Sequence, residues 1–201
     1  MTARSYSWRG VDDPGRIDHA RVHFSSDGMR AFGTATAPDF ATVWQLDVDR
    51  QWVTSQLRVT ARGWGWSRSL VLARSEHGVW TAEASADGDD SGLAEPGLAD
   101  PASVAGALDC DLGLCPVTNT MPILRLGLLG VAASPTTLTM AWVDVPSLQV
   151  IRGDQVYSSS GHGGRVDYES AERDFHAALT VDDDGVVVDY PGLATRIDGP
   201  A

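Results

Sequence analysis

The chain has 201 residues, of which 43% are hydrophobic, which suffices for one well-buried core, and we expect a single domain over residues 1–201. A formal net charge of −12 at pH 7 removes the overall attraction on which nucleic-acid and anionic-bilayer binding usually depends, so a neutral or apolar partner is expected. No stretch approaches the ~18 apolar residues of a membrane span, and the N-terminal residues lack the apolar core of a secretory signal, which favours a cytoplasmic protein without stable membrane insertion.

Alternation of apolar and polar residues with a period of two predicts half-buried strands along most of the chain. Segments 17–24, 57–61 and 137–142 have this pattern. Turn signals such as Asp27-Gly28 and Asp183-Asp184-Gly185 separate such segments. Long helical periodicity is not found between the strand patterns, so we predict a mainly β protein with one strongly curved antiparallel sheet and at most one or two short helices.

The middle of the chain is less regular. Residues 86–101 are rich in Asp, Gly, Ala, Ser and Pro and predict an exposed loop. Asp100 followed by Pro101 is a helix start signal, yet the alternation from Val104 to Cys110 also fits a strand, and both readings stay open. The hydroxyl-rich segment 158–164 is predicted to be a flexible loop.

Seven tryptophans are many for this length, and most are expected to fill the core between packed strands. Trp64 and Trp66 are separated by Gly65 and should point to the same face of a strand. We predict that this pair forms an aromatic surface facing a ligand.

The segment 109–122 departs most from a generic β domain, because it combines polar side chains with two cysteines and two prolines. Asp109 and Asp111 share a strand face, where they could raise each other's pKa, hold a cation or accept backbone hydrogen bonds. Thr118, Asn119 and Thr120 lie between prolines that stiffen the backbone, and Asn119 could bind a sugar hydroxyl or brace the loop. We predict that the segment forms a wall of a pocket with a polar floor.

Motifs for metals, cofactors and nucleophilic catalysis are weak. Cys110 and Cys115 are too few for a four-ligand zinc site and are expected to be free thiols. His19 and His23 would lie about 13 Å apart on a strand. The acidic run 182–184 lacks the calcium-loop spacing, and no Gly-x-Ser-x-Gly motif occurs. We therefore predict no metal, no cofactor and no catalytic residue.

The elements Asp109-Cys110-Asp111-Leu112 and Pro116-Val117-Thr118-Asn119-Thr120-Met121-Pro122-Ile123 are followed in order by 155–157, by Phe175 and by 185–193. In this ordered series the chain resembles the putative glycolipid-binding family of bacteria. The resemblance implies a spiral β-roll, half-barrel-like, similar to bacterial carriers of lipoproteins and lipoglycans, whose concave face holds acyl chains. Leu124 stands where a second basic residue beside Arg125 is expected, so a doubly basic clamp for an anionic head group is not predicted.

Together these features predict non-catalytic binding of a lipid or glycolipid in the concave face of the sheet. The predicted ligand-binding residues lie on the aromatic pair, on the polar segment and at the expected rim: Trp64, Trp66, Asp109, Asp111, Thr118, Asn119, Thr120, Arg125, Tyr157 and Tyr190. One alternative is a hydrolase or isomerase that uses Asp109 or Asp111 near Tyr157. Another is a protein-interaction domain that binds through a sheet edge or an apolar face.

Overall fold

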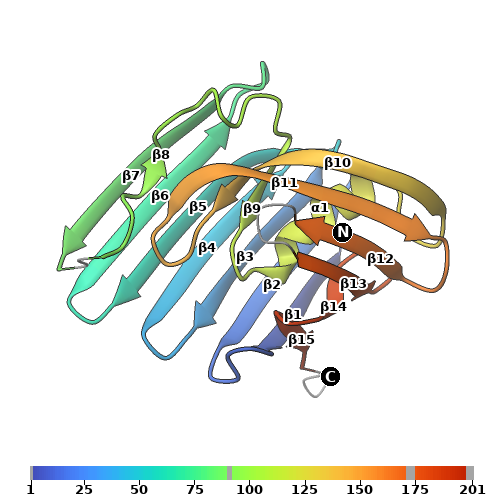
Figure 1. Ribbon diagram of the computed structural model, residues 1–201, viewed down its shortest axis with the longest axis horizontal. Coiled ribbons are helices and arrows are strands. Elements are labelled where there is room, and N and C mark those ends of the chain that lie inside the picture. The colour runs from blue at the N-terminus through green and yellow to red at the C-terminus, as the bar shows by residue number, and fades with distance from the viewer. Residues whose placement is uncertain (1, 90–91, 171–174, 198–201) are drawn as a thin grey trace.

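The computed structural model describes residues 2–89, 92–170 and 175–197. In this part of the chain all strands belong to one curved sheet that does not close into a barrel, in the order β7-β6-β5-β4-β3-β2-β1-β15-β14-β13-β12-β11-β10-β9, with β8 beside β11 (Figure 1). The strands are β1 (Thr2–Gly10), β2 (Ile17–Ser25), β3 (Gly28–Thr36), β4 (Phe40–Val48), β5 (Thr54–Gly63), β6 (Trp66–Arg74), β7 (Trp80–Gly88), β8 (Gly97–Leu98), β9 (Asp109–Leu112), β10 (Ala132–Val143), β11 (Gln149–Ser160), β12 (Arg165–Ser170), β13 (Phe175–Val181), β14 (Val187–Tyr190) and β15 (Ala194–Arg196).

The pairing is antiparallel except that β9 is parallel to β10 and β8 to β11. The first and last strands, β1 and β15, are neighbours in the middle of the sheet order. Alternation behaves as predicted: Leu57, Val59 and Ala61 on β5 are buried, while Arg58 and Arg62 are exposed. The prediction of a mainly β protein with one large curved sheet and few helices is confirmed.

The inner face of the sheet is covered by the chain's own segment 99–131, which carries β9, the short 3-10 helix η1 (Pro116–Asn119) and helix α1 (Thr120–Arg125) (Figure 1). Apolar side chains of this segment, including Val104, Leu112, Val117 and Met121, pack in the same buried cluster as the inward-facing residues of β1–β6. A second cluster joins α1 to β10–β14. The concave face is therefore filled by the protein's own apolar residues.

Three local predictions need correction. No helix starts at Asp100; its carboxylate accepts from the amide of Ala102, and successive turns run to Gly106 before β9 begins. The predicted loop 86–101 includes the end of β7 and all of β8, with residues 90 and 91 outside the described residues. The segment 158–164 begins as strand, because β11 extends to Ser160. In the second and third cases pairing with a neighbouring strand outweighs the local turn composition.

The acidic run 182–184 forms the predicted hairpin turn, in which Asp182 Oδ1 accepts from the amides of Asp184 and Val186. Segment 17–24 lies in strand β2, as predicted. Among the residues described here, no helix is both long and apolar enough to cross a membrane.

Candidate functional site

The polar segment found in the sequence forms a buried network next to helix α1. Asp109 on β9 is 1% exposed and accepts two hydrogen bonds from Arg125, with Nη1 to Oδ1 at 2.6 Å and Nη2 to Oδ2 at 2.5 Å. Arg125 Nη1 also donates to the carbonyl oxygen of Trp52, at 2.8 Å. Burial raises the pKa of Asp109, and the guanidinium of Arg125 opposes that rise. The bidentate pair ties β9 to α1 and to the turn before β5.

A second set of hydrogen bonds starts from Asp111. Its carboxylate accepts from the Thr118 hydroxyl at 2.7 Å and from Gln155 Nε2 at 2.6 Å. The Tyr157 hydroxyl lies within hydrogen-bond distance of Gln155 Oε1 at 3.0 Å and Asn119 Oδ1 at 2.9 Å. Burial raises the pKa of Tyr157 well above its usual value. These contacts hold η1 against β11. The polar groups of this network are therefore hydrogen-bonded to one another within the protein.

The network brings together six of the predicted residues, namely Asp109, Asp111, Thr118, Asn119, Arg125 and Tyr157. Thr120 is fully buried beside them, and its hydroxyl has no hydrogen-bond partner among the described residues. Tyr190 lies in the second cluster, with its ring 5.6 Å from that of Tyr168. The contacts of Asn119 match the bracing alternative, because its amide is bonded to Tyr157 and to the Pro116 carbonyl.

The structure separates the predicted tryptophan pair. Trp64 lies on the turn between β5 and β6 and is fully exposed. Trp66 starts β6 and packs against the first buried cluster, with its ring next to Gly63. The expectation of one shared face is wrong because Trp64 is in the turn, where the alternation of a strand does not apply.

Cys110 and Cys115 are free thiols, as predicted, and both are buried. Burial raises the pKa of Cys110 to about 12 and raises that of Cys115 further. Both groups are therefore neutral thiols near pH 7, which makes them poor nucleophiles and poor metal ligands. No group of three or more His, Cys, Asp or Glu side chains that could hold a metal ion occurs in the part of the chain that the structure describes.

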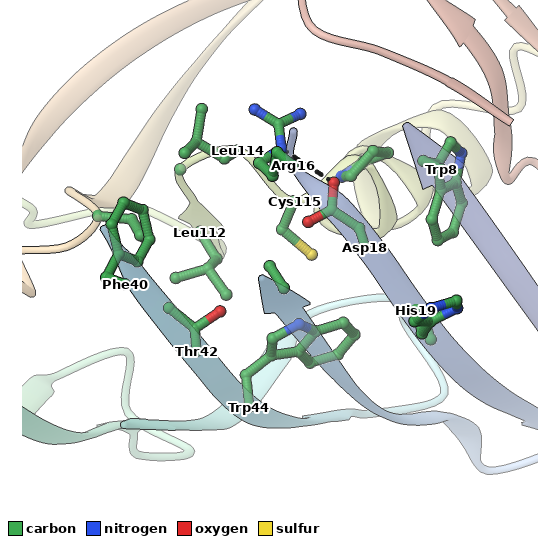
Figure 2. A pocket seen from close by; sticks show the side chains of 15 residues that line it. Trp8, Arg16, Asp18, His19, Phe40, Thr42, Trp44, Leu112, Leu114 and Cys115 are labelled. Carbon is green, nitrogen blue, oxygen red and sulfur yellow. Dashed lines mark hydrogen bonds and ion pairs between the residues drawn. The ribbon is translucent and has the colours of Figure 1, made fainter. Parts of the chain in front are cut away.

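A pocket of about 20 Å³ lies where the segment 112–116 meets strands β2–β4 (Figure 2). This volume is about that of one water-sized group. Its walls are mostly apolar side chains, among them Trp8, Phe40, Trp44 and Leu112. The ring of Trp44 fits because Gly33 faces it on β3, where a Cβ atom would lie 2.5 Å from the ring.

One wall of the pocket is an ion pair between Arg16, the residue before β2, and Asp18 on β2. Arg16 and Asp18 are 4% and 6% exposed, and Arg16 Nε lies 3.1 Å from Asp18 Oδ2. Arg16 Nη2 also donates to the carbonyl of Leu193, at 2.8 Å. Burial raises the pKa of Asp18 from 3.8 to about 6, although Arg16 opposes the rise.

Further residues with polar atoms line the same pocket. Figure 2 shows the Cys115 sulfur next to the carboxylate of Asp18, and Thr42 and Trp44 on the opposite side of the pocket that all four line. Thr42 and Trp44 are 3% and 5% exposed, and neither side chain has a hydrogen-bond partner within the described ranges of the chain. The Thr42 hydroxyl and the Trp44 indole nitrogen are not fully buried, so water or a small polar ligand in the pocket can bond to them.

The sequence analysis missed this site, although a signal was present. Asp18 and Thr42 fall on inward-facing positions of their strands, in the alternations Asp18-Ala20-Val22 and Thr42-Trp44-Leu46. A polar residue at an apolar position of such a pattern costs free energy unless it has a partner, and so deserves examination. The sequence pattern does not show that Asp18 and Thr42 line the same pocket; this follows from the structure.

The fold and the pocket together define a curved open sheet, filled by its own inserted segment, with a small half-polar pocket at the seam between the two. The chain belongs to the putative glycolipid-binding family, whose model matches residues 5–196. It is similar to the crystal structure of a DUF1089 family protein from Pseudomonas aeruginosa, with 26% sequence identity and a TM-score of 0.69, over 90% of this chain and 92% of that chain. No curated protein matches this chain.

Proposed function

We propose that the protein binds a lipid or glycolipid without catalysing a reaction, and that a hydroxyl of the polar head group occupies the pocket at Asp18, Thr42 and Trp44. The observation that carries this proposal is a largely apolar pocket lined by the buried carboxylate of Asp18 and by Thr42 and Trp44, whose side chains have no hydrogen-bond partner among the described residues. A sugar hydroxyl both donates and accepts, and the CH groups of a sugar ring can pack on indole. Family membership supports the class of ligand.

The acyl part of such a ligand needs space that the closed inner face does not provide. The pocket lies at the seam between β2–β4 and the segment 112–116, so displacement of this segment would open the inner face next to the head group. Leu114 in this segment has φ of 65°, a left-handed conformation that costs about 1–2 kcal/mol for a residue with a side chain. Release of that strain would offset part of the cost of opening.

The first test is native mass spectrometry of the protein purified gently from its host, followed by solvent extraction of anything bound. A stoichiometric lipid or glycolipid is expected. Binding of the identified lipid is then measured by isothermal titration calorimetry for Thr42→Val, which removes the hydroxyl at nearly constant volume. Loss of one hydrogen bond should weaken binding about tenfold. Thr34→Val, on the outer face of β3, is the matched control and should bind as the unmodified protein does.

Equal affinity for the Thr42→Val and Thr34→Val variants would show that the head group does not use this pocket. Protein that remains free of lipid in the cell extract and in titrations with extracted host lipids would contradict the function itself.

A hydrolase or isomerase is the second candidate, because an aspartate with a pKa of about 6 in a pocket is suited to act as a general base. In this alternative the catalytic residue is Asp18. Asp109 and Asp111, for which the sequence suggested that role, are hydrogen-bonded to Arg125 and to Gln155. Mass spectrometry of the extracted ligand after incubation distinguishes the two functions. A binding protein returns the ligand unchanged, whereas an enzyme converts it and loses that activity in Asp18→Asn.

A further inference from the structure

The outer face of strands β1–β5, which points away from the core, has an unusual charge for this acidic protein. Exposed arginines occupy outward positions on four of these strands. They are Arg9, Arg21, Arg30, Arg58 and Arg62, and we call this surface the outer arginine face. Asp47 is the one acidic side chain at an outward strand position of β1–β5. The face therefore carries a clear positive excess although the chain as a whole has a net charge of −12.

Four arginines elsewhere in the structure are paired one to one with a carboxylate. Arg16, Arg125, Arg152 and Arg196 each form an ion pair with an aspartate. On the outer arginine face, Arg30 and Arg58 share the single carboxylate of Asp47, at 3.3 Å and 3.9 Å. Within the described residues Arg9, Arg21 and Arg62 form no ion pair. These side chains are available to an anionic partner.

Two large apolar side chains are exposed among these arginines. Phe32 on β3 is 59% exposed and Val43 on β4 is 61% exposed. In the strand register, Arg21 lies opposite Phe32, Phe32 opposite Gln45, and Gln45 opposite Arg58. β3 and β4 are also the central strands of the β1–β6 half of the sheet, so Phe32 and Val43 lie on the middle strands of this face.

Acidic residues lie on the turns at the strand ends, for example Asp27 and Asp49 at one end and Asp39 at the other. A strand of nine residues is about 30 Å long, so its centre is about 15 Å from either end. The Debye length at physiological ionic strength is about 8 Å. Over that distance the turns do little to reduce the positive potential at the centre of the face.

We propose that the outer arginine face docks reversibly on an anionic lipid bilayer, with Phe32 and Val43 entering the head-group region and the arginines contacting lipid phosphates. Positive charge around exposed apolar side chains is the chemistry that recognises an anionic membrane surface. Single-stranded nucleic acid would need a row of aromatic side chains for stacking. Over the described residues of its strands, this face offers a single exposed aromatic side chain, Phe32. The inference goes beyond the proposed function, because docking does not depend on the head-group pocket.

The expectation that anionic bilayers do not attract this chain was based on the net charge, which averages the charge over all faces of the molecule. A plane contacts one face at a time, and the charge of that face decides the interaction at short range.

The test is co-sedimentation of the protein with vesicles of phosphatidylcholine alone or with phosphatidylglycerol added. We expect binding to the mixed vesicles, weaker binding at higher salt, and little binding to phosphatidylcholine alone. Each surface arginine near an anionic membrane is worth about fivefold in affinity, so Arg21→Gln with Arg58→Gln should reduce binding by about 25-fold. Phe32→Ser should also reduce it. Arg50→Gln with Arg165→Gln is the control, because it makes the same charge change at exposed positions outside this face.

Absence of binding to the mixed vesicles, or an equal loss in the control variant, would overturn the proposal. So would equally tight binding of a single-stranded oligonucleotide through the same arginines, because that would assign the face to nucleic acid. Thr42→Val should bind vesicles like the unmodified protein, so a failure of docking and a failure of the head-group pocket give different results.

Discussion

At the scale of single residues, the ion pair of Arg125 with Asp109 has a structural role. Both side chains are largely buried, at 15% and 1% side-chain exposure, and removal of one partner from such a pair leaves an uncompensated charge that costs several kcal/mol. The sequence predicted that Arg125 binds the ligand. In the structure, however, Arg125 has little freedom to turn toward a lipid head group at the rim. Its hydrogen bonds to Asp109 and to the Trp52 carbonyl already use the fork of the guanidinium.

Asp18 makes the stability of the fold depend on pH. Burial raises its pKa from 3.8 to about 6, so the folded state holds this proton more tightly than the unfolded state. The contribution of Asp18 to the free energy of unfolding should therefore fall as pH rises from about 4 to about 6 and stay constant above that. A shift of this size corresponds to about 3 kcal/mol at most.

Urea denaturation of the unmodified protein and of Asp18→Asn, at intervals from pH 4 to pH 7, measures this contribution. As pH rises, the free energy of unfolding of the unmodified protein should decrease relative to that of Asp18→Asn. Asp167→Asn, at an exposed position on β12, should show no comparable trend. A constant difference between Asp18→Asn and the unmodified protein would mean that Asp18 is ionised throughout this range.

At the scale of secondary-structure elements, β7 forms one edge of the sheet, at the end of the strand order opposite β9. The bonds Ser75 N to Val79 O and Asp89 N to Gly65 O fix which residues of β7 pair with β6. In an antiparallel pair such residues alternate, so the amides of Thr81, Glu83 and Ser85 point to β6. Those of Ala82, Ala84 and Ala86 point outward, and no backbone hydrogen bond to them is present in the described part of the chain.

Hydrogen exchange followed by NMR should show this alternation along β7. The amides of Ala82, Ala84 and Ala86 should exchange faster than those of Thr81, Glu83 and Ser85 by about tenfold or more, because they need no opening of the sheet. On β5, which has strand neighbours on both sides, neighbouring amides should not alternate in this way. Uniformly slow exchange along β7 would indicate that another strand covers the edge in solution.

Comparison of the elements shows what the sequence could predict. Period two predicts β2 and β5 because burial on one face imposes the alternation directly. The same rule fails for 104–110, because this segment lies over the inner face of the sheet and is buried by contacts distant in sequence. The polar residues near Asp111 were identified by composition, but the pocket at Asp18 was not, because it depends on the register that brings β2 beside β3 and β4.

At the scale of the whole molecule, the two buried clusters are joined at the place where the first and last strands pair. Trp8 on β1 donates to the Val187 carbonyl at 2.8 Å, and Arg196 donates to the carbonyls of Val186 and Val187, both at 2.9 Å. Leu193 packs against both clusters. Because neither cluster can lose these contacts alone without exposing apolar surface of the other, we expect the clusters to unfold together.

The residue types allow this expectation to be measured. Trp8, Trp44 and Trp80 lie in the first cluster, whereas Tyr157, Tyr168 and Tyr190 lie in the second; the fourth tyrosine, Tyr6, belongs to the first. Urea unfolding followed by tryptophan fluorescence and by the ¹⁹F NMR resonances of fluorotyrosine at the three second-cluster positions should give the same midpoint. Arg196→Ala removes the bonds to Val186, Val187 and Asp182 and should lower both midpoints equally. Arg165→Ala, on the exposed side of β12, is the control. Separate midpoints for the two probes in the unmodified protein would mean that each cluster folds on its own, and the pairing of β1 with β15 would then join two independent units.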